Sequence, residues 1–346
     1  TTSKMRTHSL LFTFALVLLA NELEAADQHR LVNSGKGAIS MPVLALGTWE
    51  LNDTEVDLAI NAGLEVGYTH VDTANNYGNQ IAVGNAIRKY AQDPASIFLT
   101  TKVPACEELL TANCLEATQQ RIAENFEQLA VSRIDLLLLH FPPVGGCQGE
   151  RLCANVRGTW RALELEYAKG DGAGATLGAI GVSNYCPSCF ACLSGESYPS
   201  KEWANRMDAA TPAVNQVMLH VGMGPDPAGT YPGGQGICSY DAAYGAGLGS
   251  GGGVVTQAYS PLGDGTSELI TGDLVSGIGA AHNVSGAQVS LQWLLNHQVP
   301  LVSKSTSQAH LEEDFDLFGF QLSDAEMAAL DAATSPPGNY SFRCTE

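Results

Sequence analysis

The chain has 346 residues, of which 45% are hydrophobic and 15% are charged, and its formal net charge at pH 7 is −19. This composition is typical of a folded globular protein and excludes a disordered or fibrous chain. The excess of carboxylates argues against binding to nucleic acids or to anionic membranes, because both need clustered Lys and Arg side chains. An anionic cofactor would therefore need a local positive site.

The N-terminal segment has the pattern of a secretory signal peptide. Lys4 and Arg6 precede an apolar run at residues 10–20, and small residues follow the run. The run is too short to cross a bilayer as a helix, which takes about 20 apolar residues. We predict a signal peptide over residues 1–26, with the natural start at Met5. The alternatives are an uncleaved signal anchor and a buried extra helix.

The rest of the chain fits the secretory pathway. Cleavage is expected near Ala25 or Ala26, and it would leave a secreted or lumenal protein without a membrane span. All nine cysteines lie downstream of the apolar run, as expected in an oxidising compartment. Three N-x-S/T acceptors, at Asn52, Asn283 and Asn339, predict a glycoprotein.

Cysteine spacing suggests two short loops. Cys106 and Cys114 bracket one candidate loop, and Cys147 and Cys153 bracket another. Spacing does not establish connectivity, and an odd number of cysteines leaves at least one thiol free or paired with another chain. The C-x-x-C-x-x-C motif at residues 186–192 favours a disulfide or buried thiols at the start of a helix, because a metal cluster usually needs four thiolates. No metal is predicted.

Eight short apolar runs recur along the chain after the leader, separated by segments with helical signals. Most of them lack strict alternation, which suits strands buried on both faces of a parallel sheet. The eight runs cover residues 44–47, 70–72, 97–102, 134–140, 179–183, 213–219, 254–259 and 300–304. We expect one domain over residues 27–346, a single (β/α)8 TIM barrel preceded by the signal peptide. An open doubly wound sheet is the alternative.

Local motifs support this organisation. Capping boxes mark two helix starts, Ser285 with Gln288 and Ser323 with Glu326. Glycines within residues 245–253 satisfy G-x-G-x-x-G, but a dinucleotide fingerprint must follow a strand and open a helix. These glycines precede a strand-like run, so we interpret them as a flexible helix-to-strand loop.

Four polar residues end or closely follow the apolar runs, namely Asp72, Tyr77, Lys102 and His140. In a parallel barrel, the carboxyl ends of the strands and the loops after them form one mouth, where catalytic groups lie. Each residue alone is more often a helix cap, a packing group or a solvated charge. Together, at strand ends, they predict an active site.

These four side chains suit carbonyl reduction, in which hydride adds to the carbon while the oxygen takes a proton. A phenol has an ordinary pKa near 10. We expect the Lys102 ammonium to lower the pKa of Tyr77 by stabilising its phenolate. Asp72 would keep Lys102 charged and oriented. His140 could hydrogen-bond the substrate oxygen and help to transfer the proton.

The segment at residues 67–79, GYTHVDTANNYGN, strongly resembles the first signature of the aldo-keto reductases. The resemblance extends from about Gly37 to Leu330. Further motifs occur in the family's order, with GTW at 47–49, GVSN at 181–184, NQV at 215–217, AYSPL at 258–262 and KS at 304–305. The resemblance implies an extended nicotinamide cofactor across the barrel mouth.

The resemblance also implies which residues hold this cofactor. Ser183, Asn184 and Gln216 would hydrogen-bond the nicotinamide carboxamide, and Tyr259 would stack on the nicotinamide ring. The other implied cofactor positions around the mouth are Thr48, Ser260 and Leu262.

At the phosphate end, Lys304 and Ser305 match the family positions that hold the 2′-phosphate of NADP. The chain departs from the family where His310 replaces Arg and Asp314 replaces Asn, while Glu313 keeps its acidic match. Loss of the Arg removes a bidentate donor, and Asp314 would add an unfavourable charge near the phosphate. NADP is the first choice, and NAD or dual use is the alternative.

The substrate pocket is less clearly indicated. Trp49 and Phe141 match apolar wall positions of the family, and the connection at residues 142–157 would form one rim, which its two cysteines could staple. Residues 263–266 are short and depart from the family's cofactor-covering loop, which argues against tight cofactor retention.

We therefore predict an NADPH-dependent oxidoreductase that reduces a small aldehyde or ketone to an alcohol, with Tyr77 as the proton donor. The alternative is a secreted or surface protein that keeps the barrel for a structural or binding role with weak or no catalysis. The predicted leader favours this alternative, because an exported reductase lacks an obvious supply of reduced cofactor.

Overall fold

The computed structural model describes most of the chain after the predicted leader. The described residues are 28–33, 37–106, 111–144, 147, 149–170, 176–185, 187–194, 211–223 and 254–337. The predicted signal peptide, the glycine-rich loop at 245–253, Cys186 and the glycosylation acceptor Asn339 lie outside the described residues.

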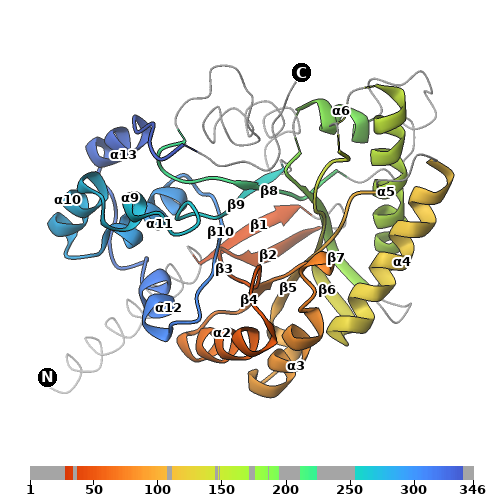
Figure 1. Cartoon of the computed structure of the whole chain (residues 1–346), viewed down its shortest axis with the longest axis horizontal. Helices are drawn as coiled ribbons and strands as arrows, with labels where there is room; N and C mark the ends of the chain where they lie inside the picture. Colours follow the sequence, from red (N-terminus) through yellow and green to blue (C-terminus); the bar gives the residue numbers. More distant parts are fainter. Residues whose placement is uncertain are drawn as a thin grey trace, which may run out of the picture.

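Eight parallel strands form a closed barrel (Figure 1). They are β3 (Leu44–Gly47), β4 (His70–Asp72), β5 (Phe98–Val103), β6 (Arg133–Leu139), β7 (Thr176–Ser183), β8 (Val214–Met218), β9 (Val255–Tyr259) and β10 (Leu301–Ser303). β10 pairs with both β3 and β9, so the sheet has no edge. The predicted (β/α)8 barrel and its eight strands are confirmed, and the doubly wound alternative is wrong.

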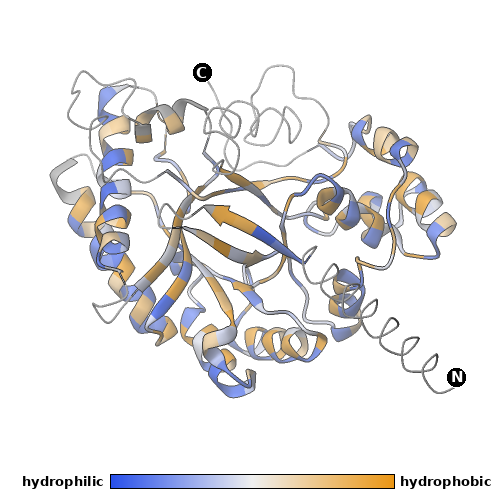
Figure 2. Ribbon diagram, turned by 180° about the vertical axis from the view of Figure 1, so that it is seen from behind, coloured by the Kyte–Doolittle hydropathy of each residue, from blue (hydrophilic) through white to orange (hydrophobic). Residues whose placement is uncertain are grey.

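Helices surround the barrel. They are α2 (Asp53–Val66), α3 (Gln80–Tyr90), α4 (Thr111–Leu129), α5 (Glu150–Ala168), α6 (Pro187–Ser194), α9 (Ser267–Thr271), α10 (Asp273–His282), α11 (Gly286–Asn296), α12 (Gln308–Phe315) and α13 (Asp324–Asp331), with short 3-10 turns η1 (Asn75–Tyr77) and η2 (Pro94–Ser96). Figure 2 shows hydrophobic and hydrophilic residues interleaved along the helices, as expected when one helix face packs on the barrel.

Burial explains why the strands lack alternation. Every residue of β4, β5 and β8 is buried, because alternate side chains point into the barrel and towards the helices. The two predicted capping boxes open α11 and α13 as expected. Two predicted glycosylation acceptors have local structural roles, since Asn52 caps α2 and Asn283 ends α10 in a left-handed conformation.

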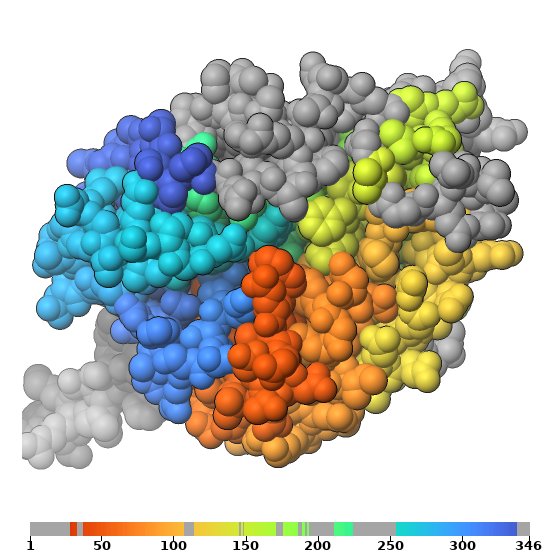
Figure 3. All heavy atoms as spheres, in the orientation of Figure 1, coloured from red at the N-terminus to blue at the C-terminus, as the bar shows by residue number. Residues whose placement is uncertain are grey.

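An N-terminal hairpin was not predicted from the sequence. β1 (His29–Asn33) and β2 (Ala38–Pro42) pair in antiparallel register and pack Val32 and Met41 against barrel residues. The red-orange N-terminal segment lies at the centre of one face of the molecule (Figure 3). The hairpin therefore covers the amino end of the barrel and leaves the opposite end to the loops.

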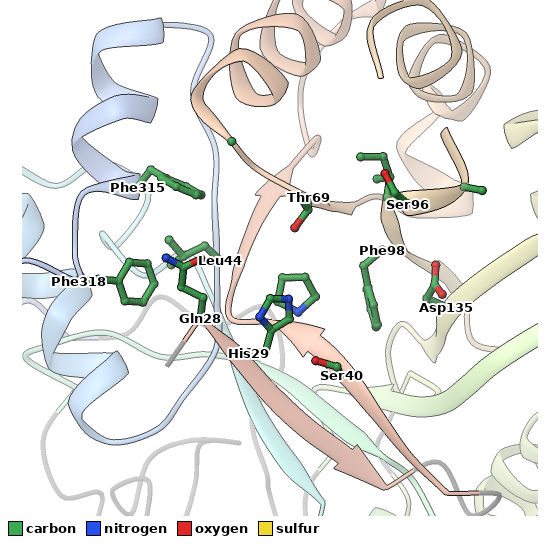
Figure 4. A pocket seen from close by; sticks show the side chains of 14 residues that line it. Gln28, His29, Ser40, Leu44, Thr69, Ser96, Phe98, Asp135, Phe315 and Phe318 are labelled. Carbon is green, nitrogen blue, oxygen red and sulfur yellow. The ribbon is translucent and has the colours of Figure 1, made fainter. Parts of the chain in front are cut away.

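A cavity of about 370 Å³ lies at this amino end, between the hairpin and the starts of the strands (Figure 4). His29 and Ser40 come from the hairpin, and Leu44 and Phe98 begin β3 and β5. The cavity is thus at the other end of the strands from the polar residues predicted to be catalytic.

Within the part of the chain that the structure describes, three disulfides connect six cysteines. The bond between Cys106 and Cys114 closes the first candidate loop. The second candidate loop is wrong, because Cys147 bonds to Cys189 and Cys153 bonds to Cys192. These partners come from α6, which packs beside α5, so the thiols meet through tertiary packing. The two bonds join the connection after β6 to the helix after β7.

Two absences hold for the part of the chain that the structure describes. None of its helices is long and apolar enough to cross a membrane. No group of three or more His, Cys, Asp or Glu side chains within it could hold a metal ion.

Candidate active site

The four polar residues predicted to be catalytic come from neighbouring elements at the carboxyl end of the barrel. Asp72 is the last residue of β4, Lys102 lies near the end of β5, and His140 follows β6. Tyr77 ends the η1 turn after β4. Parallel pairing of β4 with β5 and of β5 with β6 brings these strand ends side by side.

Lys102 connects the acidic and phenolic groups. Its Nζ donates to Asp72 Oδ1 at 2.5 Å, to the Thr73 carbonyl at 3.0 Å and to the Tyr77 hydroxyl at 3.3 Å. Gln216 Nε2 donates to Asp72 Oδ2 at 2.8 Å, so both carboxylate oxygens have donors. The structure therefore brings Asp72, Tyr77 and Lys102 into one hydrogen-bonded group.

Burial shapes the protonation of this group. Lys102 is only 1% exposed and Asp72 only 3%. Burial opposes the ammonium charge, but the Asp72 carboxylate and the Tyr77 hydroxyl outweigh it and raise the pKa of Lys102. Lys102 thus remains a cation in the core because its anionic partner is buried with it.

Lys102 lowers the pKa of Tyr77, as the sequence predicted, but the net shift is upward. Burial raises the pKa of Tyr77 above its ordinary value, and the Lys102 charge lowers it only in part. The Asp72 carboxylate also raises this pKa. Desolvation has the largest effect on this pKa, because a phenolate would lose its hydration in the barrel mouth. The phenol therefore stays protonated at neutral pH.

His140 is a neutral imidazole in this site. Burial and the nearby Lys102 charge hold the pKa of His140 well below its ordinary value. Its ring stacks on Phe141, with ring centroids 4.6 Å apart, and meets Tyr77 edge-on at 5.5 Å. Its Nδ1 lies 2.8 Å from Asn76 Oδ1. Sequence analysis missed Asn76, although it directly precedes Tyr77 in the family signature.

The residues predicted to hold the nicotinamide lie beside this group. Asn184 Nδ2 donates to the His140 carbonyl at 3.2 Å, and its Oδ1 accepts from the Tyr259 hydroxyl at 2.9 Å. Ser183 Oγ donates to the Gln216 carbonyl at 2.8 Å. The ends of β7, β8 and β9 thus form one polar patch next to the Lys102 group.

The other predicted cofactor positions around the barrel mouth also contact residues of the protein itself. Thr48 Oγ1 donates to the Asp72 carbonyl at 3.1 Å. Ser260 Oγ donates to Asp264 Oδ1 at 2.5 Å, and Leu262 packs against the hydrophobic core. The sequence did not predict this contact with Asp264. The Asp264 carboxylate accepts the hydrogen bond of the Ser260 hydroxyl, which the resemblance assigns to cofactor binding.

At the predicted phosphate end, Lys304 lies near a carboxylate. Its Nζ is 3.5 Å from Glu50 Oε2 and 5.6 Å from the centre of the Trp49 ring. Ser305 Oγ accepts from the Ser307 amide at 3.0 Å. Sequence analysis missed Glu50, which follows the GTW motif and has a positive φ of 60°.

Helix α12 carries the other predicted phosphate-end residues. His310 is exposed, Glu313 is half-buried and Asp314 is buried. Burial raises the pKa of Asp314 to about 7, and a hydrogen bond from Ser303 opposes this shift. The expected negative charge at Asp314 is therefore only partial near neutral pH, because desolvation disfavours the ionised form of a buried carboxyl.

The predicted substrate walls face different environments. Trp49 is 47% exposed, whereas Phe141 is half-buried against His140. The predicted rim at residues 142–157 includes the start of α5 and is joined to α6 through Cys147 and Cys153. Disulfides do fix the rim, as predicted, but they join it to α6 and do not link its two cysteines to each other.

The fold and the site together define a (β/α)8-barrel enzyme with a buried Lys–Asp–Tyr group at the carboxyl ends of its strands. The chain belongs to the aldo-keto reductase family, since the model of the "Aldo/keto reductase family" matches residues 43–220 and 251–335.

Relatives with known names support this assignment. The chain is 32% identical over 292 residues to an aldo-keto reductase of Mycolicibacterium vanbaalenii, covering 84% of this chain and 88% of the relative. It is 30% identical over 317 residues to morphine 6-dehydrogenase of Pseudomonas putida, covering 88% of this chain and 92% of the relative.

Solved structures agree. An aldo-keto reductase from a Medee basin deep-sea metagenome library superposes with a TM-score of 0.70 at 25% identity, covering 92% of this chain and 99% of the other. The aldose reductase of Schistosoma japonicum gives a TM-score of 0.67 at 25% identity, covering 90% and 94%. The protein is an oxidoreductase that acts on small carbonyl compounds, and its family generally uses NADH or NADPH.

Asp314 gives a pH-dependent prediction about stability. Its folded pKa of about 7 lies above the unfolded value of 3.8, so the folded protein holds a proton between these values that the unfolded chain has lost. Wild-type stability should fall as pH rises through this window and stay low above it. Asp314→Asn should therefore raise the free energy of unfolding at pH 8 by up to roughly 4 kcal/mol and change it little at pH 4.

Urea denaturation at both pH values measures this effect. Asp316→Asn makes the same change at an exposed position that ends the same helix, and it should leave the stability difference between the two pH values unchanged. Equal effects of Asp314→Asn at pH 4 and pH 8 would contradict the assignment.

Proposed function

We propose that the protein reduces an aldehyde or ketone to an alcohol with NADPH, using Tyr77 as the proton donor. The observation that carries the proposal is the position of Lys102 Nζ, 2.5 Å from Asp72 Oδ1 and 3.3 Å from the Tyr77 hydroxyl. A buried cation held by a carboxylate and directed at a phenol is suited to stabilise the phenolate that forms when Tyr77 gives up its proton.

The chain's own residues prepare the proton transfer. The raised pKa of Tyr77 keeps the phenol protonated and ready to donate at neutral pH. Lys102 and Asp72 hold charge in place before the reaction, so little reorganisation is needed when the phenolate appears. His140 is neutral and lies beside Tyr77, where its ring can hydrogen-bond the substrate oxygen without adding a second positive charge.

The polar patch at the ends of β7, β8 and β9 fits a nicotinamide group. The amides of Asn184 and Gln216 offer acceptors and donors, and the half-buried Tyr259 offers an aromatic face. Gln216 Nε2 donates to Asp72 and Gln257, so Oε1 is the atom suited to accept from a carboxamide. When bound there, the cofactor would supply the hydride, and these residues would orient its ring.

The choice between NADPH and NADH depends on the predicted phosphate end of the site, around Lys304. Lys304 supports NADPH, because an ammonium attracts a 2′-phosphate. NADH is the second candidate, and the contact between Lys304 and Glu50 favours it, because a neighbouring carboxylate competes with the phosphate for the ammonium. The exposed His310 lacks the bidentate geometry of an Arg at this position.

Tyr77→Phe tests the catalytic proposal. Removal of the hydroxyl should lower kcat for a reactive aldehyde by about 10²–10⁴, the usual contribution of a positioned proton donor. Affinity for NADPH, followed by quenching of Trp fluorescence, should change little. Tyr90→Phe removes a hydroxyl that binds Asp57 outside the barrel and should retain full activity. If Tyr77→Phe keeps more than half of the wild-type rate, Tyr77 is not the donor.

Glu50→Gln tests the cofactor proposal. An exposed ion pair is worth about 0.2–1 kcal/mol, so freeing Lys304 from Glu50 should tighten NADPH binding by about 1.4- to fivefold. NADH has no 2′-phosphate, and its affinity should change little. Glu116→Gln removes the same charge from an exposed position on α4 and serves as the control. Equal tightening of both cofactors would remove Lys304 from the 2′-phosphate site.

We also propose that the protein acts in an oxidising compartment, as a secreted or lumenal enzyme. The three disulfides among the described residues support this proposal, because cytosolic thiols are kept reduced. Protein from a secreting eukaryotic cell should lack the predicted leader and expose at most three thiols of nine when denatured without reductant. Nine free thiols with the leader retained would place it in a reducing compartment.

A further inference from the structure

Asn76 and Tyr77 are consecutive residues of the η1 turn, and they contact two different members of the site. The Tyr77 hydroxyl accepts from Lys102 at 3.3 Å, while Asn76 Oδ1 lies 2.8 Å from His140 Nδ1. The backbone bond from the Tyr77 amide to the Ala74 carbonyl, 3.1 Å long, shapes this turn. One short turn thus holds the phenol and the partner of the imidazole in a defined relation.

The partner of Nδ1 matters because His140 is neutral. A neutral imidazole carries one N–H, so the group bound at Nδ1 decides whether Nε2 is a donor or an acceptor. With the amide oxygen of Asn76 against Nδ1, Nδ1 carries the proton and Nε2 presents a lone pair. With the amide turned by 180°, Nδ2 donates to Nδ1 and Nε2 carries the proton.

Carbonyl reduction needs the second arrangement. The substrate oxygen gains negative charge as hydride adds to the carbon, and an N–H group stabilises that charge whereas a lone pair repels it. An Asn side chain can offer either its oxygen or its NH₂ group to the same nitrogen. A carboxylate at this position could only accept, and an apolar side chain could do neither.

We propose that Asn76 is a positioning residue that sets the tautomer of His140. In the reactive arrangement its amide is turned by 180° from that in the structure, where Oδ1 lies 2.8 Å from Nδ1. Asn76 Nδ2 then donates to Nδ1, and Nε2 donates its proton in a hydrogen bond to the substrate oxygen. The amide acts through His140 and does not itself touch the substrate. This inference rests on the proposed reductase function and deepens it, by assigning a role to a residue outside the four catalytic ones.

The groups that face His140 determine how its protonation, and hence the rate of reduction, should depend on pH. Lys102 faces it from β5 and lowers its pKa, Tyr77 faces it from η1, and Asp72 lies behind Lys102 on β4. Asn184, directly after β7, donates to the His140 carbonyl and is uncharged. Between pH 6 and 9 the wild-type imidazole and phenol therefore keep their protonation states, and reduction should show no titration of His140.

Asn76→Asp is the informative variant. A carboxylate holds the proton on Nδ1 and leaves Nε2 as a lone pair at high pH. It also favours the imidazolium, in which both nitrogens carry protons. Reduction of a reactive aldehyde by Asn76→Asp should therefore rise about tenfold or more as pH falls from 9 to 6, the scale of one hydrogen bond to a charged group.

Two further variants separate this effect from a structural one. Asn76→Leu has similar size but no polar atoms, so kcat should fall about tenfold at every pH with KM nearly unchanged. Asn85→Asp makes the same chemical change on the exposed face of α3, where its oxygen can still accept from Arg88. It should behave like the wild type throughout.

Nitrogen NMR of His140 in the full-length protein completes the test without relying on activity. Asn76→Asp should raise the titration midpoint of His140 by at least one pH unit and hold the proton on Nδ1 above it. A His140 titration and a pH–rate profile in Asn76→Asp that match the wild type would overturn the inference. A wild-type protein that reduces no aldehyde would overturn the proposed reductase function, while the NMR titration would still report on Asn76.

Discussion

The buried ion pair between Lys102 and Asp72 is the interaction on which the carboxyl end of the barrel depends. Removing two ions from water is costly, and their attraction compensates only when hydrogen bonds satisfy both groups. Here Gln216, the Thr73 carbonyl and the Tyr77 hydroxyl supply those bonds. The pair therefore requires β4, β5, β8 and the turn after β4 to keep one arrangement, and that arrangement also positions the phenol.

The balance of charge differs between the two ends of the site, the inner end around Lys102 and the outer, phosphate end around Lys304. The inner end has a buried cation whose charge is matched by Asp72, with amides of β7 and β8 around it. At the outer end, Lys304 lies beside Glu50, and Ser260 donates to Asp264. In a chain with a net charge of −19, such carboxylates oppose an anionic cofactor. The catalytic end is thus better arranged for its proposed chemistry than the phosphate end is for binding an anion.

Strand pattern and strand-end chemistry were readable from the sequence. A run that is apolar throughout and lacks alternation is compatible with a strand buried on both faces, and eight such runs with helices between them leave few folds to consider. Parallel strands present their carboxyl ends at one side of a barrel, so Asp72, Lys102 and His140 were expected to meet. The family motifs elsewhere in the chain added the cofactor positions, which composition and spacing alone do not indicate.

The tertiary structure decided what depends on distances between remote residues and on loss of water. Cys147 and Cys153 bond to cysteines on α6, which spacing along the chain could not reveal. Burial raised the pKa of Tyr77 despite the predicted lowering by Lys102, and burial also raised the pKa of Asp314. A sequence states which groups are present, whereas pairing and protonation follow from which groups share a solvent-free space, and only the closed barrel defines that space.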